Sequence, residues 1–252
     1  MPRIIVITGA ASGIGKATAE LFRRAGDTVI GVDLSGTDVA ADLSKPEGRA
    51  AMVAEVTQRA PHGIDGVLAG AGISRPDPMT IAVNYFGAVA TLEGLRPLLA
   101  KSAKPRAVPI CSTAAILPGS DTVVQACLAG EEAAAIAACA TVPMSAYPDS
   151  KKALTLWMRA AAVKTEWAGA GISLNGIGPG VVLSPMTAPL FDDPAMVAAI
   201  QQSNPIATKG YARPEEIAEV IHFLLTVDTP YLLGQLLFVD GGSDALLRPS
   251  HF

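Results

Sequence analysis

Short apolar runs alternate with longer segments of helical length along the whole chain. The runs Ile4–Ile7, Thr28–Val32 and Leu236–Val239 are almost continuously apolar rather than alternating apolar with polar. Such runs are typical of strands buried on both faces of a parallel sheet. Segments suited to helices lie between them, among them Pro46–Arg59 and Pro214–Leu225. The alternation predicts right-handed crossovers and a Rossmann-type, doubly wound parallel sheet of the α/β class.

The same pattern continues through the middle of the chain, without an internal repeat or a linker that would divide it. We therefore expect one dinucleotide-binding and catalytic domain over residues 1–252. The other expected elements are the helices Ile14–Ala25, Thr80–Ala100 and Ser145–Ala168 and the strands Asp65–Ala69, Ala107–Cys111 and Ile172–Ile177.

Two segments interrupt the alternation. Residues 115–144 contain a Gly/Ser/Asp turn and then an Ala-rich helix with Glu131 and Glu132 in its first turn, where the helix dipole favours acidic side chains. Residues 185–205 are rich in Pro, Met and Asp, and a short helix is expected around Ala195–Gln202. Both segments follow sheet strands, where α/β proteins bind their ligands. We interpret the first as a helical insertion and the second as a substrate lid.

Composition narrows the class of protein. Half of the residues are hydrophobic but only 5% are aromatic, and the formal net charge of -4 gives no reason to expect a nucleic-acid partner. The three cysteines, Cys111, Cys127 and Cys139, lack the spacing of a metal site. They are expected to be buried in a reducing compartment, and no metal is expected. Neither a signal peptide nor an apolar run of roughly 18 residues is present, which predicts a cytoplasmic protein with no membrane partner.

A glycine-rich turn, TGAASGIG, follows the first apolar run and opens a helix. A strand, turn and helix in this order present backbone N–H groups and a helix N-terminus to a pyrophosphate. The glycines are needed because a Cβ would block the close approach or the turn. The candidate cofactor-binding residues of this turn are Thr8, Gly9, Ser12, Gly13, Ile14 and Gly15.

Asp33 lies at the end of the second expected strand, twenty residues after Gly13. A carboxylate at this place binds the adenosine ribose hydroxyls and repels a 2′-phosphate. Because no Lys or Arg follows it in VDLSGTDVA, the sequence favours NAD(H) over NADP(H). The alternative for Asp33 is a turn cap. Asp42 and Leu43 resemble an adenine-contacting pair, and helix capping is the alternative for Asp42.

The segment Tyr147-Pro-Asp-Ser-Lys151 places a phenol and an ammonium four residues apart, on one face of the expected helix. An ordinary phenol titrates near ~10, too high for efficient proton transfer at neutral pH. The ammonium and a nicotinium charge would favour the phenolate. Lowering the pKa by about two units corresponds to roughly 3 kcal/mol. An exposed aromatic–cation pair is the alternative for these two residues alone.

Two polar residues complete the candidate chemistry. Ser112 follows the expected strand that ends at Cys111 and faces the same crevice, where its hydroxyl could hold a substrate oxygen. Asn84 is a polar residue in the mainly apolar stretch VNYFGA, and a locally satisfied helix residue is an equally good interpretation of it.

Taken together, these motifs resemble those of the short-chain dehydrogenase/reductase family over essentially the whole chain. The resemblance implies a catalytic tetrad of Asn84, Ser112, Tyr147 and Lys151, with Tyr147 as the acid/base. Lys151 would bind the nicotinamide ribose and lower the Tyr147 pKa, Ser112 would orient the carbonyl or alcohol, and Asn84 would anchor a water. The further cofactor-binding residues are Leu34, Asp42, Leu43, Ala71, Gly72, Tyr147, Lys151, Pro179, Gly180, Val182 and Ser184.

The chain departs from the family pattern at two places. The common Asn-Asn-Ala-Gly is Ala69-Gly70-Ala71-Gly72 here, and Ser184 replaces a frequent Thr. Within the family, the insertion and stretches such as LNGIGPG resemble the bacterial 3α-hydroxysteroid dehydrogenases/carbonyl reductases. This implies oxidation of a secondary alcohol or reduction of a ketone, on a 3α-hydroxysteroid or a bulky alicyclic or aromatic carbonyl. Ser112, Tyr147, Pro185 and Met186 are the expected substrate contacts.

Two other functions stay open at this point: a reductase of small xenobiotic or terpenoid ketones without steroid activity, and a dinucleotide-sensing module. In many family members the helices around Asn84 and Tyr147 form part of a tetramer interface. The insertion between these helices would obstruct that packing, so a homodimer is expected.

Overall fold

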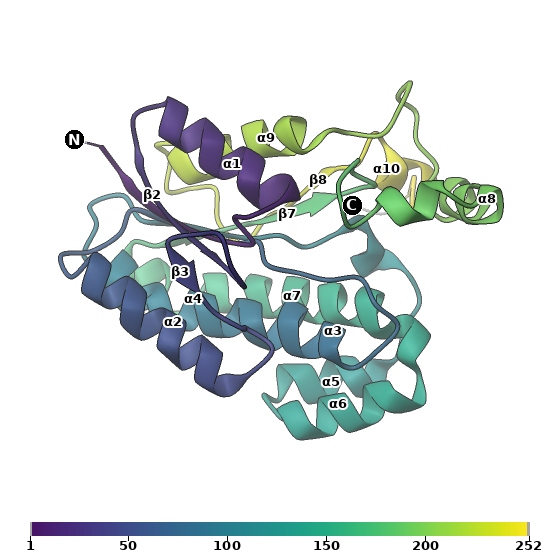
Figure 1. The fold of residues 1–252 in the computed structure, drawn as a ribbon, viewed down its shortest axis with the longest axis horizontal. Coiled ribbons are helices and arrows are strands. Elements are labelled where there is room, and N and C mark those ends of the chain that lie inside the picture. The colour runs from purple at the N-terminus through teal and green to yellow at the C-terminus, as the bar shows by residue number, and fades with distance from the viewer. Residues whose placement is uncertain (1, 251–252) are drawn as a thin grey trace.

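A parallel sheet runs through the middle of the molecule, with helices packed on both of its faces (Figure 1). The computed structural model describes residues 2–250. Six strands pair in parallel in the order β3-β2-β1-β4-β5-β6, and β7 pairs with β8. The strands are β1 (Ile4–Thr8), β2 (Thr28–Asp33), β3 (Val39–Ala40), β4 (Gly66–Ala69), β5 (Arg106–Pro109), β6 (Ser173–Leu174), β7 (Gly176–Pro179) and β8 (Leu236–Val239).

β6 and β7 form one line interrupted at Asn175, so the sheet continues from β5 through β7 to β8. The Asn175 backbone N–H still donates to Ala107, and Ile110 bridges to Ile177 in parallel. The Asn175 side chain turns to the loop before β8, where it donates to the Leu232 carbonyl at 2.7 Å. The expected doubly wound parallel sheet is therefore confirmed.

Helices cover both faces of the sheet (Figure 1). They are α1 (Gly13–Arg24), α2 (Pro46–Arg59), α3 (Met79–Ile81), α4 (Ala88–Leu99), α5 (Asp121–Leu128), α6 (Glu132–Thr141), α7 (Ala146–Ala162), α8 (Pro194–Ser203), α9 (Pro214–Thr226) and α10 (Ser243–Leu247). On one face α1 and α9 bury Phe22, Ile217 and Ile221 against the sheet residues Ile5 and Ile7. On the other face α2, α4 and α7 enclose the larger apolar core (Figure 1).

The predicted bounds of α2 and β8 are those of the structure. The helix predicted over Thr80–Ala100 is instead three consecutive pieces: α3, a π-helical turn Ala82–Gly87, and α4. The helix predicted over Ser145–Ala168 ends at Ala162, because the chain then turns so that Trp167 packs into the core and Gly171 adopts a φ of 76°. Wide π-helical turns such as Ala82–Gly87 are frequent at functional sites.

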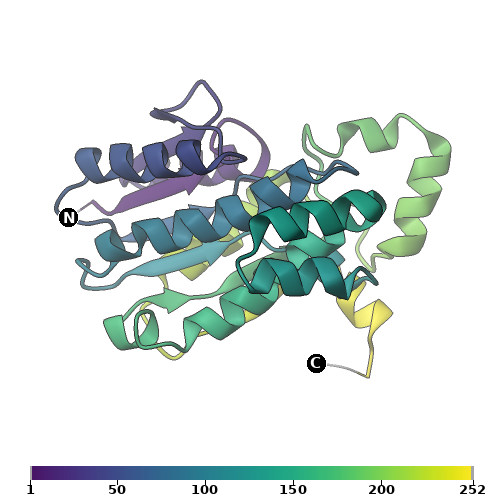
Figure 2. The ribbon, with the colours of Figure 1, turned by 90° about the horizontal axis from the view of Figure 1, so that it is seen from below.

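The insertion is a pair of helices rather than one. Residues 121–128, which follow the predicted Gly/Ser/Asp turn and for which the sequence predicted no element, form α5, which begins where the Ser120 hydroxyl accepts a hydrogen bond from the Val123 N–H. Its buried face, Val123, Val124 and Cys127, packs against α6 and α7. The correction has a simple cause: eight residues carry too little periodicity to identify a helix that tertiary packing stabilises. In Figure 2 the teal pair lies over the helical layer.

The lid segment projects from the body at the end of the molecule opposite the N-terminus (Figure 1). Its helix α8 matches the predicted short helix to within a residue or two. Where the segment begins, Val182 forms a parallel bridge with Ala212, which attaches it to the chain before α9. Within residues 2–250 no helix is long and apolar enough to cross a membrane.

Candidate active site

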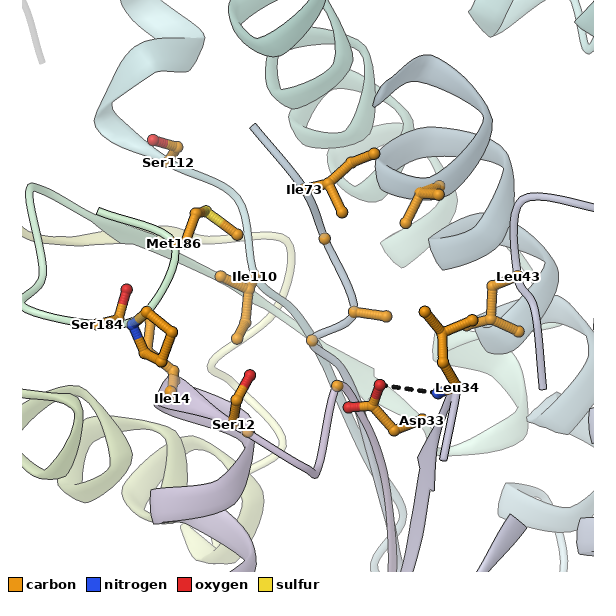
Figure 3. Close-up of a pocket in the computed structure, with 18 of the residues that line it drawn as sticks. Ser12, Ile14, Asp33, Leu34, Leu43, Ile73, Ile110, Ser112, Ser184 and Met186 are labelled. Atoms are coloured by element: carbon orange, nitrogen blue, oxygen red, sulfur yellow. Dashed lines mark hydrogen bonds between the residues drawn. The ribbon is translucent and has the colours of Figure 1, made fainter. Parts of the chain in front are cut away.

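A cavity of about 500 Å³ opens at the carboxyl ends of the parallel strands (Figure 3). In a doubly wound sheet this edge is the expected ligand site. The predicted site residues that line it are Gly9, Ser12, Gly13, Ile14, Gly15, Asp33, Leu34, Asp42, Leu43, Ala71, Gly72, Ser112, Tyr147, Lys151, Pro179, Gly180, Val182, Ser184, Pro185 and Met186. Thr8 and Asn84 are not among the lining residues.

The glycine turn suits a dinucleotide because its backbone segments approach each other so closely that no Cβ would fit between them. Gly9 and Gly13 have φ angles of 77° and 52°. A Cβ on Gly15 would lie 2.1 Å from the Gly9 carbonyl oxygen, and one on Gly9 would lie 2.9 Å from backbone atoms of Gly70 and Ala71. Ser12 precedes α1 without a side-chain capping bond, and the first turn of α1 holds no acidic residue. The helix N-terminus is therefore suited to a pyrophosphate.

The Asp33 carboxylate is held in place at the end of β2. It accepts hydrogen bonds from the Ala11 N–H at 2.9 Å and the Leu34 N–H at 2.8 Å (Figure 3). Leu34 beside it is 68% exposed, so its side chain forms an apolar shelf at the cavity rim. Both the turn-capping alternative and the ribose-binding interpretation agree with this geometry, because each uses a positioned carboxylate.

The Asp42 side chain is engaged in a local turn before α2. Its carboxylate accepts hydrogen bonds from the Ser44 hydroxyl at 2.6 Å and the Ser44 N–H at 3.0 Å. The hydroxyl bond, more than the ion pair with Lys45 at 3.2 Å, lowers the Asp42 pKa. The structure therefore assigns this side chain a turn-forming role. Asp42 and Leu43 also line the cavity.

Thr8 and Asn84 act on the backbone that forms the cavity wall. The Thr8 hydroxyl accepts from the N–H groups of Gly70 at 3.0 Å and Ala71 at 3.1 Å. The Asn84 amide oxygen accepts from the Ile73 N–H at 2.8 Å, and its NH₂ donates to the Ile73 carbonyl at 2.9 Å. Thr8 and Asn84 thus do not line the cavity. Thr8 positions the AGAG segment, and Asn84 positions Ile73 directly after it. The water relay implied for Asn84 stays a prediction.

A third Asn84 hydrogen bond connects the π-helical turn to the helix that carries Tyr147. The amide donates to the Ser150 hydroxyl at 3.1 Å, and that hydroxyl donates to the Tyr147 carbonyl at 2.7 Å. Asn84 and Ser150 are fully buried. The π-helical turn thereby fixes the start of α7 relative to the cofactor wall.

Ser112, Tyr147 and Lys151 come together at one end of the cavity. Ser112 follows β5, is almost fully buried, and accepts from the Ala114 N–H at 3.1 Å. The Lys151 ammonium donates to the Ile110 carbonyl at 2.7 Å and lies 5.7 Å from the centre of the Tyr147 ring. Strand β5 and helix α7 therefore supply a hydroxyl, a phenol and an ammonium to one small space.

The Tyr147 pKa shifts in the direction opposite to the one expected from the sequence. Burial raises the Tyr147 pKa, and the hydrogen bond with Ser112 only partly offsets that effect. Burial also lowers the Lys151 pKa to about 8. The ammonium is bonded to Ile110 rather than to the phenol. Burial therefore opposes the lowering of the Tyr147 pKa that the sequence predicts for Lys151 together with the nicotinium charge, and that lowering stays a prediction.

The start of the lid is held by a small hydroxyl network. The Thr187 hydroxyl accepts from the Ser184 N–H at 3.0 Å and donates to the Val182 carbonyl. The two hydroxyls of Ser184 and Thr187 lie 3.4 Å apart. Pro185 and the half-exposed Met186 follow on the cavity wall, so the lid presents an apolar surface beside Ser112 (Figure 3).

Several cavity residues escaped the sequence analysis: Ile73, Arg75, Met79, Val83, Ile110 and Thr187. Ile73 directly follows AGAG and Val83 directly precedes Asn84, so position next to a motif was the available signal. Arg75 and Met79 lie on a loop whose course no short motif predicts. Within residues 2–250, no group of three or more His, Cys, Asp or Glu residues is arranged for a metal.

Comparison with known proteins agrees with this geometry. A family model described as enoyl-(acyl carrier protein) reductase matches residues 9–244. The 3-alpha-hydroxysteroid dehydrogenase/carbonyl reductase of Comamonas testosteroni is 36% identical, over 99% of both chains. The cis-4-hydroxycyclohexanecarboxylate dehydrogenase of Sinomonas cyclohexanicum is 31% identical, over 97% of both.

A solved structure is similar over its whole length. The 3-alpha-hydroxysteroid dehydrogenase from Pseudomonas sp. B-0831, complexed with NADH, has a TM-score of 0.91 and 41% identity, covering 99% of this chain and 100% of that one. An oxidoreductase of the NAD(P)-dependent class is therefore what the fold and site define. The chain belongs to the short-chain dehydrogenase/reductase family.

Proposed function

We propose that this protein interconverts a secondary alcohol and a ketone with NAD(H), on 3α-hydroxysteroids or other bulky alicyclic or aromatic carbonyl compounds. One observation carries the proposal: Ser112, Tyr147 and Lys151 lie on the wall of the same cavity as the glycine turn and Asp33. The relatives named as 3-alpha-hydroxysteroid dehydrogenases support the substrate class.

The chain's own residues divide the work as follows. The glycine turn and Asp33 would hold NAD(H), which would supply the hydride acceptor for alcohol oxidation and the hydride donor for ketone reduction. The Ser112 hydroxyl holds the substrate oxygen by a hydrogen bond. The Tyr147 phenol gives a proton to that oxygen in reduction, and the phenolate takes it back in oxidation. The Lys151 ammonium binds the ribose of the cofactor, and Asn84 anchors the water that relays the proton.

The preference for NAD(H) rests on Asp33 and its surroundings. A carboxylate at the end of β2 disfavours a 2′-phosphate, and the lysine lining that end of the cavity, Lys45, is already paired with Asp42. The NADH bound by the similar structure is consistent with this preference.

An apolar cavity mouth supports a bulky apolar substrate. Met79 and Met186 line the cavity and are 49% and 44% exposed. Exposed apolar clusters of this kind usually mark binding sites. A smaller alicyclic alcohol is the second candidate, favoured by the relative that acts on cis-4-hydroxycyclohexanecarboxylate.

A substrate panel tests the proposal. Initial rates with NAD(H) are measured for 3α-hydroxysteroids, 3-ketosteroids, and small cyclic alcohols and ketones. Turnover of the steroids supports the first substrate class, and turnover of small ketones alone replaces it with the second. Tyr147→Phe should abolish turnover and leave NADH binding, measured by fluorescence, intact. Unchanged turnover in this variant would reject the mechanism. NADH binding by the wild-type protein without turnover of any compound in the panel would favour a sensing module.

We also infer that the protein is a cytoplasmic homodimer. All three cysteines are buried and unpaired in the described part of the chain, which suits a reducing compartment. The insertion helices α5 and α6 pack against α7 and the π-helical turn, and so occupy a face that a larger assembly of this family would use.

A further inference from the structure

One buried ion pair joins the insertion to the cofactor side of the molecule. Arg49 on α2 and Glu132 at the start of α6 are 83 residues apart in sequence. Two bonds in parallel link them, from Nη1 to Oε2 at 2.7 Å and from Nη2 to Oε1 at 2.6 Å. This bidentate geometry is the strong form of the guanidinium–carboxylate interaction. The Arg49 side chain is only 8% exposed and that of Glu132 is 26% exposed.

The same guanidinium binds three backbone carbonyls. Its Nε donates to Leu43 at 2.7 Å, and Nη2 donates to Ala82 at 3.0 Å and Ser44 at 3.2 Å. Leu43 and Ser44 line the cavity on the Asp33 side. Ala82 begins the π-helical turn, which carries Asn84. The Asn84 side chain in turn binds the Ile73 backbone. Arg49 therefore connects two parts of the cofactor wall that lie on different elements.

A buried guanidinium needs a counter-charge, and Glu132 supplies it. Removing one partner of a buried pair leaves the other charge uncompensated. The carboxylate also sits at the N-terminus of α6, where the helix dipole favours it. Without Glu132, water would enter to solvate the Arg49 guanidinium, or the Arg49 side chain would move out toward solvent. The three carbonyls would then lose their common donor.

We propose that Glu132 and Arg49 are positioning residues that make the helical insertion part of the cofactor site. Through this pair, α6 holds the turn at residues 42–45 and the π-helical turn in the arrangement that binds the dinucleotide. The proposal rests on dinucleotide binding and not on the substrate class. Its tests need no substrate except for the measurement of KM and kcat. Failure of the steroid assignment therefore leaves it standing.

The first test is the affinity for NADH. Glu132→Gln removes the charge with almost no change in shape, and we expect the Kd for NADH to rise about tenfold, the scale of coupling between such linked sites. With a substrate that turns over, KM for the cofactor should rise similarly, while kcat at saturating cofactor stays within about threefold, since Ser112, Tyr147 and Lys151 are untouched.

Glu131→Gln is the matched control. Glu131 is the preceding, exposed residue and carries the same charge, so this variant changes the net charge equally and should leave the Kd for NADH unchanged. Arg49→Lys keeps the positive charge but lacks the forked donors, and it should weaken NADH binding as Glu132→Gln does. In the double variant the two effects should not add. An unchanged Kd in Glu132→Gln, or an equal loss in Glu131→Gln, would overturn the proposal.

Hydrogen exchange provides a test on the unmodified protein, so poor folding of a variant does not leave the proposal untested. Saturating NADH should slow amide exchange within α6, although α6 does not line the cavity. This protection should be lost in Glu132→Gln and kept in Glu131→Gln. Exchange in α6 that does not respond to NADH in the unmodified protein would refute the coupling.

Discussion

Burial and one backbone hydrogen bond set the charge states of the central catalytic groups. Burial raises the Tyr147 pKa, because the phenolate would lose its hydration. Burial lowers the Lys151 pKa to about 8, because the ammonium would lose its hydration. The Lys151 ammonium donates to the Ile110 carbonyl and lies 5.7 Å from the centre of the Tyr147 ring. The cofactor-free protein thus holds a neutral phenol at neutral pH, ready to donate a proton rather than to accept one.

The pH dependence of the reaction follows from this. A raised pKa means that the phenolate appears only at high pH, so alcohol oxidation should accelerate with rising pH and ketone reduction should slow. Below the apparent pKa, kcat/KM for the alcohol at saturating NAD⁺ should rise about tenfold per pH unit. In the cofactor-free protein, the difference in phenolate absorbance between wild type and Tyr147→Phe should be absent below about pH 10. Ionisation of Tyr147 below pH 9 without cofactor would contradict the structure.

Cofactor choice is decided at a second residue, Asp33. Asp33→Asn keeps one of the two oxygens that accept from the N–H groups of Ala11 and Leu34 and removes the charge. We expect the ratio of kcat/KM for NAD⁺ to that for NADP⁺ to fall by at least about tenfold, a change of about 1.4 kcal/mol. Asp33→Ala, which also removes the acceptor, should further weaken NAD⁺ binding. A ratio that is the same in both variants as in wild type would exclude Asp33 from the selection.

Single residues were predictable where a short motif carries them. The glycine turn, Asp33, Ser112 and Lys151 all lie on the cavity wall, because each belongs to a local pattern next to a strand end. The Arg49–Glu132 pair could not be predicted in this way, since its partners are 83 residues apart and meet only in the folded chain. The direction of the Tyr147 pKa shift likewise depends on burial, which spacing does not report.

At the scale of elements, α2, α8 and β8 were predicted closely, whereas α5 and the π-helical turn were not. Helix α2 and strand β8 have the bounds expected from their apolar patterns. Helix α5 was missed because its eight residues are stabilised by α6 and α7 rather than by their own propensity. The π-helical turn was also missed, since its extra residue per turn is maintained by the Asn84 bonds to distant backbone.

The attachment of the insertion to the catalytic helix gives a prediction at this scale. Asp149, fully buried on α7, accepts from the Ser120 N–H at 2.8 Å and the Ser145 hydroxyl at 2.6 Å. Asp149→Ala leaves the Ser120 N–H without its acceptor, while the Ser145 hydroxyl keeps the Val142 carbonyl, and it should lower the free energy of unfolding by about 1–3 kcal/mol. Urea denaturation measures it.

The control is the other polar contact between insertion and α7. Asp121 is 87% exposed and pairs with Lys152 at 3.3 Å. Asp121→Asn should change the unfolding free energy by less than about 1 kcal/mol, as exposed pairs do. Equal losses in the two variants would show that burial of Asp149 is not what joins these helices.

For the whole molecule, the parallel sheet brings distant residues to one edge. Strand β1 ends at the glycine turn, β2 at Asp33, β5 near Ser112 and β7 near Gly180, and each of these positions lines the cavity. Their convergence follows from the strand order, which is why the fold class was sufficient to place the site. The insertion then covers the helical layer beneath the sheet (Figure 2).

That covered face leads to the prediction for the assembly. Packing of α5 on α7, and of α6 on the π-helical turn, covers the helices that the family resemblance assigns to a tetramer interface. A closed two-fold dimer through another face remains available, since such isologous pairs are the commonest oligomers. Size-exclusion chromatography with light scattering should give twice the chain mass, unchanged on adding NADH. A mass of four chains would show that the insertion does not block the larger assembly.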